Sequence, residues 1–305
     1  MITVLLSQIV LMFAMMFTGT LMYKTGKMTS EGARCLGNIL ISVILPFVVI
    51  KSFMTECTAQ RLSGLFITFA AALLALILSM LLSRLIFKSS PMSHFSAAFS
   101  NAGFIGIPLV SAMFGDEAVF YVSSFVALLN IFQWTYGVFV ITHDKRTIAI
   151  KKVLTNPVLI GLIIGLIFFF IPLETPEIVY SFVSAIAAMN APVAMFNLGA
   201  YLAQTKFRQI FTDKHAYLVS LVRLIVIPLC TIALLSLIPF QNNTIKIALL
   251  IVAAAPVGSN AAIFAQIHNK DYQHAVRCVC LSTLLSLPVL PLLTALAGAL
   301  WHVAI

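Results

Sequence analysis

Long apolar stretches separated by short polar breaks run along the whole chain. Each stretch is about 20 residues long, the length that a helix needs to cross the hydrocarbon core of a bilayer. Alternating segments of about ten residues, which would indicate a transmembrane β-barrel, are absent. The pattern therefore predicts an all-α polytopic membrane protein.

The charged and turn-forming breaks divide the chain into ten predicted transmembrane helices. The first lacks a basic region before its apolar stretch and is too long for the apolar core of a cleaved signal peptide, so we expect it to span the membrane. The predicted spans are residues 4–23, 34–54, 63–87, 93–114, 118–141, 157–173, 177–203, 215–238, 245–267 and 274–301.

Composition and charge agree with a protein in lipid. The chain is 61% hydrophobic and 9% charged, whereas a soluble domain has about 25% charged residues. Most basic residues follow the odd-numbered spans: Lys24, Lys27, Arg34, Arg84, Lys88, Lys145, Arg146, Lys151, Lys152, Lys206, Arg208, Lys214, Lys270 and Arg277. The opposite side has few basic residues, which predicts cytoplasmic basic loops and external termini in the cell inner (plasma) membrane. Topology and anionic headgroups explain the net charge of +9, so it does not indicate a nucleic-acid partner.

A polar break from His143 to Asn156 divides the chain into two five-span halves, residues 1–141 and 157–305, joined by a cytoplasmic linker, 142–156. Halves with an odd number of spans must insert in opposite orientations. Breakers recur at matching points: Gly19 and Gly165 differ by 146 positions, as do Pro46 and Pro192, while Pro108 and Pro256 differ by 148. Such pairs also arise by chance, but with the five-plus-five count they predict two inverted repeats, which are typical of secondary transporters.

Spans 4 and 9 contain clusters of helix-breaking residues, SNAGFIGIPL at 100–109 and AAPVGSNAAIFA at 254–265. Glycine and proline weaken a helix, and lipid cannot satisfy the backbone groups that a break leaves free. If the breaks cross, half-helices starting near Pro108 and Pro256 direct their positive N-termini to one point, where an anion binds. The simpler alternative is two kinked helices held by their neighbours. The candidate substrate-binding residues here are Asn101, Gly103, Gly106, Ile107, Pro108, Pro256, Gly258, Ser259 and Asn260.

Three further polar residues inside predicted spans could contribute to the site. Arg223 is the only charged residue well inside a span; it could hold a substrate carboxylate or extend to the cytoplasmic headgroups, and both alternatives stay open. Asn130 and Gln133 share one helix face, where they could line the cavity or form hydrogen bonds between helices.

The motifs NAGFIGIPL and AAPVGSNAAIFA resemble the paired crossover motifs of the auxin efflux carrier family, which includes bacterial malonate-type carriers and plant PIN-type auxin carriers. LISVILPFVVI at 40–50, NPVLIGLIIGL at 156–166 and APVAMFNLGAYLA at 191–203 resemble its second, sixth and seventh spans. The resemblance covers nearly the whole chain. It implies ten helices in two inverted repeats, a scaffold domain, and a transport domain with broken, crossing helices 4 and 9. The long central loop of many plant members is absent.

The resemblance and the residues together predict a secondary transporter of small organic anions, carboxylates such as malonate or auxin-like acids, working by alternating access. The alternative is a ligand-sensing membrane protein without net transport. No metal-ligand spacing, hydrolase motif or phosphate-binding loop occurs in the sequence, so we predict no enzyme activity, cofactor or metal. Sodium coupling, proton coupling and electrogenic uniport stay open, and small residues on spans 2 and 7 could support a homodimer.

The predicted topology can be tested with reporter fusions. A reporter placed after residue 150 should be cytoplasmic and one at the C-terminus should be external, because basic loops stay inside. A cytoplasmic C-terminus would mean an odd number of spans and would exclude the inverted repeat.

Overall fold

The computed structural model describes residues 2–144, 154–171, 175–205 and 207–303. The predicted linker, 142–156, therefore lies mostly outside the described residues, as do its basic residues Lys145, Arg146, Lys151 and Lys152 and the separate Lys206.

The described chain is helical, and several helices are joined end to end through π-helical turns. The α-helices are α1 (Ile2–Lys24), α2 (Ser30–Ile39), α3 (Leu45–Phe53), α4 (Ala59–Ile86), α5 (Pro91–Ala98), α6 (Ile107–Phe132), α7 (Val138–Thr142), α9 (Pro157–Phe170), α10 (Glu177–Ala188), α11 (Asn190–Gln204), α12 (Phe207–Thr212), α13 (Lys214–Leu221), α14 (Ile227–Ser236), α15 (Asn243–Ala254), α16 (Asn260–Ile267) and α17 (Tyr272–Leu300). The π-helical turns are Leu40–Ile44, Ala102–Gly106, Gln133–Gly137 and Val222–Val226.

Seven helical segments of the described chain are long and apolar enough to cross a membrane, and Pro157–Phe170 and Asn243–Ala254 are shorter apolar helices. The longest segment, Ala102–Thr142, is interrupted at Gly115, whose φ of 75° leaves the helical region. This kink falls between the predicted spans 4 and 5. The polytopic all-α class is thus confirmed, while the ten-span count and the inverted repeat stay predictions, as do the domain limits.

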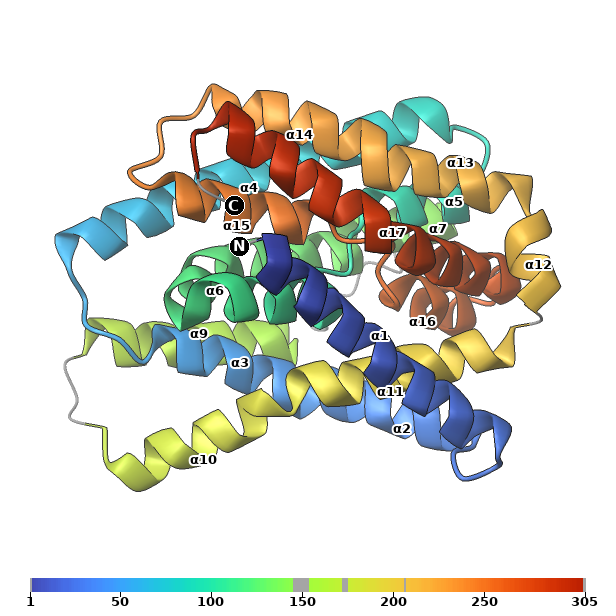
Figure 1. The fold of residues 1–305 in the computed structure, drawn as a ribbon, viewed down its shortest axis with the longest axis horizontal. Helices are drawn as coiled ribbons and strands as arrows, with labels where there is room; N and C mark the ends of the chain where they lie inside the picture. The colour runs from blue at the N-terminus through green and yellow to red at the C-terminus, as the bar shows by residue number, and fades with distance from the viewer. Residues whose placement is uncertain (1, 145–153, 172–174, 206, 304–305) are drawn as a thin grey trace.

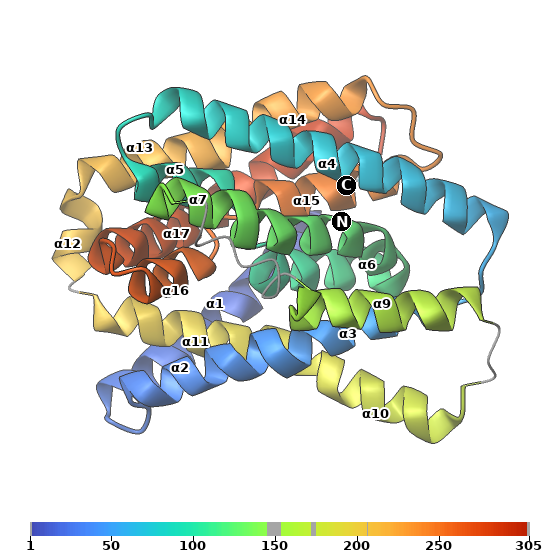
Figure 2. The ribbon, with the colours of Figure 1, turned by 180° about the vertical axis from the view of Figure 1, so that it is seen from behind.

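The helices form two groups with α6 between them (Figures 1 and 2). One group contains α2, α3, α9, α10 and α11, and the other contains α4, α13 and α14. The connections α1–α2, α4–α5 and α16–α17 lie at one end of the molecule, while α3–α4 and α14–α15 lie at the other (Figure 1).

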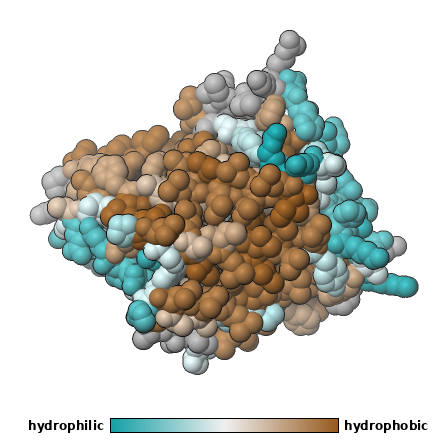
Figure 3. Space-filling model, turned by 90° about the horizontal axis from the view of Figure 1, so that it is seen from above, coloured by the Kyte–Doolittle hydropathy of each residue, from teal (hydrophilic) through white to brown (hydrophobic). Residues whose placement is uncertain are grey.

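The exterior carries a broad apolar face between polar margins (Figure 3). Large hydrophobic side chains are exposed along its helices, including Phe66 and Leu85 on α4 and Leu229 on α14. A face of this kind is not typical of a soluble protein, because monomeric soluble proteins rarely expose large contiguous apolar patches. The face therefore fits a lipid environment.

The backbones of helices α1 and α11 come into direct contact at two glycines, Gly19 and Gly199. A Cβ at Gly199 would collide with the backbone oxygen of Met16, and one at Gly19 with the backbone of Phe196. The Thr20 hydroxyl also donates a hydrogen bond to the Gly199 carbonyl at 3.0 Å. These contacts fix α1 against α11, where only glycine leaves room.

The close packing predicts a stability loss for Gly199→Ala of about 1–3 kcal/mol in the free energy of unfolding, because the added methyl group meets backbone atoms. Gly32→Ala is the matched control, since its nearest neighbour would lie 3.5 Å away. This control should be neutral or stabilising by up to about 1 kcal/mol through helix propensity. Thermal unfolding in detergent measures both variants. Equal stability of Gly199→Ala and wild type would contradict the packing argument.

Candidate functional site

The two predicted breaks lie side by side and satisfy each other's backbone groups. The backbone N–H of Asn101 donates a hydrogen bond to the Pro256 carbonyl at 2.7 Å, and the backbone N–H of Gly258 donates one to the Phe99 carbonyl at 3.0 Å. Ser100 and Val257 thereby form an isolated antiparallel bridge. A Cβ at Gly258 would lie 3.0 Å from the Ser100 carbonyl oxygen, so glycine permits this approach. Backbone pairing replaces the helical hydrogen bonds that both breaks lose.

The half-helices do not begin where the prolines suggested. After α5 ends at Ala98, helical structure resumes at Ala102, before Pro108; after α15 ends at Ala254, it resumes at Asn260, beyond Pro256. Pro108 lies in the first turn of α6, where the missing N–H is tolerated. Two helix N-termini and two C-termini therefore meet at the crossover.

A cavity of about 20 Å³ lies at the crossover. Six of the predicted site residues line it: Asn101, Gly103, Asn130, Gly258, Ser259 and Asn260. Ile41 and Leu45, from the helices on the other side, and Ser100 also contribute to its wall. Gly106, Ile107, Pro108, Pro256 and Arg223 are not among its lining residues.

The polar side chains around this cavity are not equivalent. Asn101 is 4% exposed, and its Nδ2 has no hydrogen-bond partner in the described part of the chain; the same holds for Ser259 Oγ. By contrast, Asn260 Nδ2 donates to Gln133 Oε1 at 2.8 Å, and Asn130 Nδ2 donates to the Val126 carbonyl at 2.8 Å. Since buried polar atoms normally have partners, Asn101 is the amide available for a ligand.

A second cavity of about 300 Å³ lies beyond the first half of the crossover and is lined by Ile107 and Pro108. Lys51 and Asp116 also line it and form an ion pair at 2.8 Å. Asn190 lines this cavity too, and its Nδ2 donates to the Gly103 carbonyl at 3.1 Å. Eight of the predicted residues thus divide between this cavity and the crossover cavity, while Gly106, Pro256 and Arg223 line neither.

A third cavity, of about 470 Å³, lies between α2, α11, α16 and the start of α17. Its lining residues include Arg34, Asn38, Tyr201, Gln204, Gln266 and Tyr272. Arg34 is exposed and belongs to none of the described ion pairs. The sequence analysis used Arg34 only as a topology signal and missed this cavity, because the residues that line it come from distant segments.

Close approach explains Gly106, which lines none of these cavities. A Cβ there would lie 3.0 Å from Val252 Cα on α15. The glycine therefore brings the first turn after one break against the helix that leads into the other.

Arg223 lies in the π-helical turn between α13 and α14 and is 2% exposed. Its Nη1 donates to the Ala97 and Ala98 carbonyls at 3.1 and 3.2 Å, and to Ser79 Oγ at 3.1 Å. Its Nη2 donates to the Ala253 carbonyl. The guanidinium contacts the crossover through backbone carbonyls rather than through the cavity.

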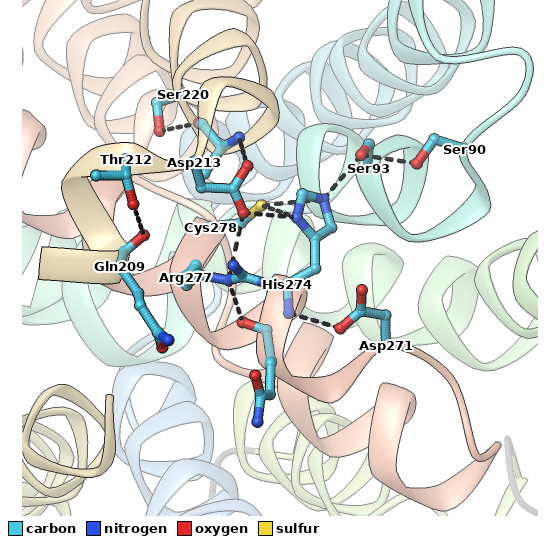
Figure 4. Close-up of polar contacts among 12 residues, drawn as sticks. Ser90, Ser93, Gln209, Thr212, Asp213, Ser220, Asp271, His274, Arg277 and Cys278 are labelled. Carbon is cyan, nitrogen blue, oxygen red and sulfur yellow. Dashed lines mark hydrogen bonds and ion pairs between the residues drawn. The ribbon is translucent and has the colours of Figure 1, made fainter. Parts of the chain in front are cut away.

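A separate polar cluster joins α5, α13 and α17 (Figure 4). His274 Nε2 lies 2.9 Å from Ser93 Oγ, and its Nδ1 lies 3.3 Å from Asp213 Oδ2, which also pairs with Arg277 Nε at 3.3 Å. The order serine, histidine, carboxylate is that of a nucleophilic triad, but Ser93 is 1% exposed and its Oγ accepts a hydrogen bond from Ser90. The cluster therefore links three helices.

The surroundings of Asp213 in this cluster favour the charged form of its carboxyl group. Burial opposes the charge, but the hydrogen bond from Ala216 N, the contact with His274 and the charge of Arg277 together lower the pKa of the Asp213 carboxyl below its ordinary value. Asp213 also caps α13, since its Oδ1 accepts from Ala216 N at 3.1 Å.

Comparison with known proteins agrees with a transport function. The chain is 24% identical, over 287 residues, to an uncharacterized transporter of Methanothermobacter thermautotrophicus. The aligned region covers 90% of this chain and 92% of that relative. A family model described as membrane transport protein matches residues 4–294. This family comprises membrane transporters rather than enzymes. The predicted resemblance is confirmed: the chain belongs to the auxin efflux carrier family of membrane transport proteins.

Proposed function

We propose that this protein is a secondary carrier of small organic anions, carboxylates such as malonate or auxin-like acids, that works by alternating access at the crossover. The observation that carries the proposal is the small crossover cavity. There the Nδ2 of Asn101, which has no hydrogen-bond partner among the described residues, lies at two helix N-termini. Larger cavities lie next to it among the helices on either side of the breaks.

The chemistry of the cavity favours an anion. The first amide groups of a helix have no partner within the helix and carry partial positive charge. The starts of two helical segments, at Ala102 and Asn260, border the cavity, and no acidic side chain is among its described lining residues. A carboxylate can accept hydrogen bonds from these amides and from Asn101.

The size of the cavity supports a closed state of the carrier. A volume of about 20 Å³ accommodates about one water molecule, which is less than any dicarboxylate requires. Binding therefore needs Ile41 and Leu45, on the opposing helices, to move away from Asn101 and Asn260. Movement of one helix group against the other would open the site towards one flanking cavity at a time.

We place the carrier in the inner (plasma) membrane with external termini, as the basic loops predict. The homodimer that small residues on spans 2 and 7 could support also belongs to this proposal, and sodium coupling, proton coupling and electrogenic uniport are its three alternatives for the energy source. Uptake and counterflow in proteoliposomes, with malonate and indole-3-acetate as probes, test the function directly. Binding of either probe without flux would favour the ligand-sensing alternative.

The unequal partners of the two asparagines predict different effects on binding and folding. Asn101→Ala should weaken malonate binding by about 1–3 kcal/mol and leave thermal stability unchanged, because no described partner of Nδ2 is lost. Asn260→Ala should weaken binding and also lower stability, because Gln133 loses its bond.

The matched control for these variants is Asn243→Ala. This substitution removes a 2.8 Å amide hydrogen bond to the Trp301 carbonyl, outside the crossover cavity. It should affect stability alone. Binding titrations and unfolding curves on all three proteins measure the effects, and wild-type affinity in Asn101→Ala would remove this residue from the site.

Arg34 should attract the anion into the third cavity, between α2, α11, α16 and the start of α17. Arg34→Gln is expected to raise the KM of transport from that side by about tenfold at low ionic strength, with a smaller effect at high salt. Arg84→Gln, at an exposed arginine that does not line the cavity, is the control. Equal KM values for the two variants would exclude an attracting role for Arg34.

A further inference from the structure

The contacts of Arg223 gather the two C-terminal helix ends of the crossover around one cation. Ala97 and Ala98 end α5, and Ala253 lies in the last turn of α15. All three carbonyls accept hydrogen bonds from the guanidinium. Ser79 on α4 completes the group through its hydroxyl, which itself donates to the Ala98 carbonyl at 2.7 Å.

These helix ends are negatively polarised and need a cation. The last carbonyls of a helix have no partner within the helix and together carry about half a negative charge. In transporters with broken helices, such C-terminal ends and unwound carbonyls coordinate the coupling sodium ion. In this protein the corresponding carbonyls are held by a side chain.

The four helix ends thus fall into two groups according to the sign of their partial charge. The two C-termini contact Arg223, whereas the residues that start the two N-terminal ends line or border the crossover cavity. Arg223 belongs to none of the described ion pairs, so its charge is balanced mainly by carbonyl groups. A sodium ion at the same carbonyls would lie within a few ångströms of the guanidinium and be repelled by it.

We propose that Arg223 is the built-in counter-cation of the crossover, and that it occupies the position of a coupling sodium ion, so that the carrier binds its anion without sodium. The inference rests on the proposed function, because it assigns the coupling of the same site. Arg223 is then a positioning residue: it fixes both breaks and leaves the N-terminal ends to the substrate.

The first test uses the wild-type protein and no variant. Thermal unfolding in detergent is compared in sodium chloride and choline chloride at equal ionic strength, with and without malonate. A ligand that binds only the folded state raises its apparent stability. We expect the same melting temperature in both salts, and the same shift with malonate. Saturable stabilisation by sodium would overturn the proposal.

The second test changes the cation. Arg223→Met should lower the melting temperature by more than about 5 °C, because buried carbonyls lose their partner, and sodium should now partly restore it. Arg223→Lys keeps the charge, so it should be the more stable of the two and stay insensitive to sodium. Ser79→Ala removes a neutral partner of the guanidinium and one hydrogen bond to the Ala98 carbonyl but leaves the cation in place. It is the matched control and should show a smaller loss that sodium does not restore.

Equal stability of the lysine and methionine variants, or stabilisation of the lysine variant by sodium, would contradict the assigned role. If Arg223→Met does not fold, the wild-type comparison and the lysine variant still decide. The melting measurements in the two salts do not need a substrate. A failure of malonate to bind or cross the membrane would therefore count against the proposed function. The comparison of melting temperatures in the two salts would still test the role of Arg223.

Discussion

The pairing of two broken backbones at Phe99–Asn101 and Pro256–Gly258 is the interaction on which the rest of the structure depends. Inside a bilayer no water can satisfy free amide and carbonyl groups, so an interrupted helix needs protein partners. Here each break donates one backbone hydrogen bond to the other, and Arg223 and Ser282 supply further partners. Because neither break can be satisfied alone, the two segments must stay together, and the helices that move with one also move with the other.

The charge of the crossover follows from this pairing. Two breaks produce four helix ends, and opposite ends attract opposite ions. The guanidinium of Arg223 covers the C-terminal carbonyls, so the positively polarised N-termini are the ends that remain for a ligand. A protein with the same breaks but no buried cation would present both signs of charge at one point. Under the proposed function, anion selectivity would depend as much on Arg223 as on the asparagines that border the cavity.

The sequence predicted the position of this site because helix breakers are rare enough in apolar spans to be conspicuous. Asn101, Gly103 and Gly258 were identified in this way and do line the cavity. The starting points of the half-helices were less accurate, since proline is tolerated one turn inside a helix and does not mark its first residue. The role of Arg223 could not be predicted, because its partners come from three segments, α4, α5 and α15, that are distant from it in the sequence. For the same reason, the cavity around Arg34 was missed.

The two asparagines of the motifs were expected to have one role, but their surroundings differ. Asn101 precedes Pro108 in its motif, whereas Asn260 follows Pro256. In the structure, Asn260 donates to Gln133 on a neighbouring helix, whereas Nδ2 of Asn101 has no partner among the described residues. A ligand that bonds to Asn260 must therefore compete with Gln133, while one that bonds to Asn101 gains a hydrogen bond without breaking any described bond of Nδ2. Closure of the cavity around Asn101 without a ligand leaves a buried donor that has no partner among the described residues. Because a cavity of about 20 Å³ is too small for a carboxylate, an anion that supplies the missing acceptor would stabilise a more open arrangement of Ile41 and Leu45 over this closed one.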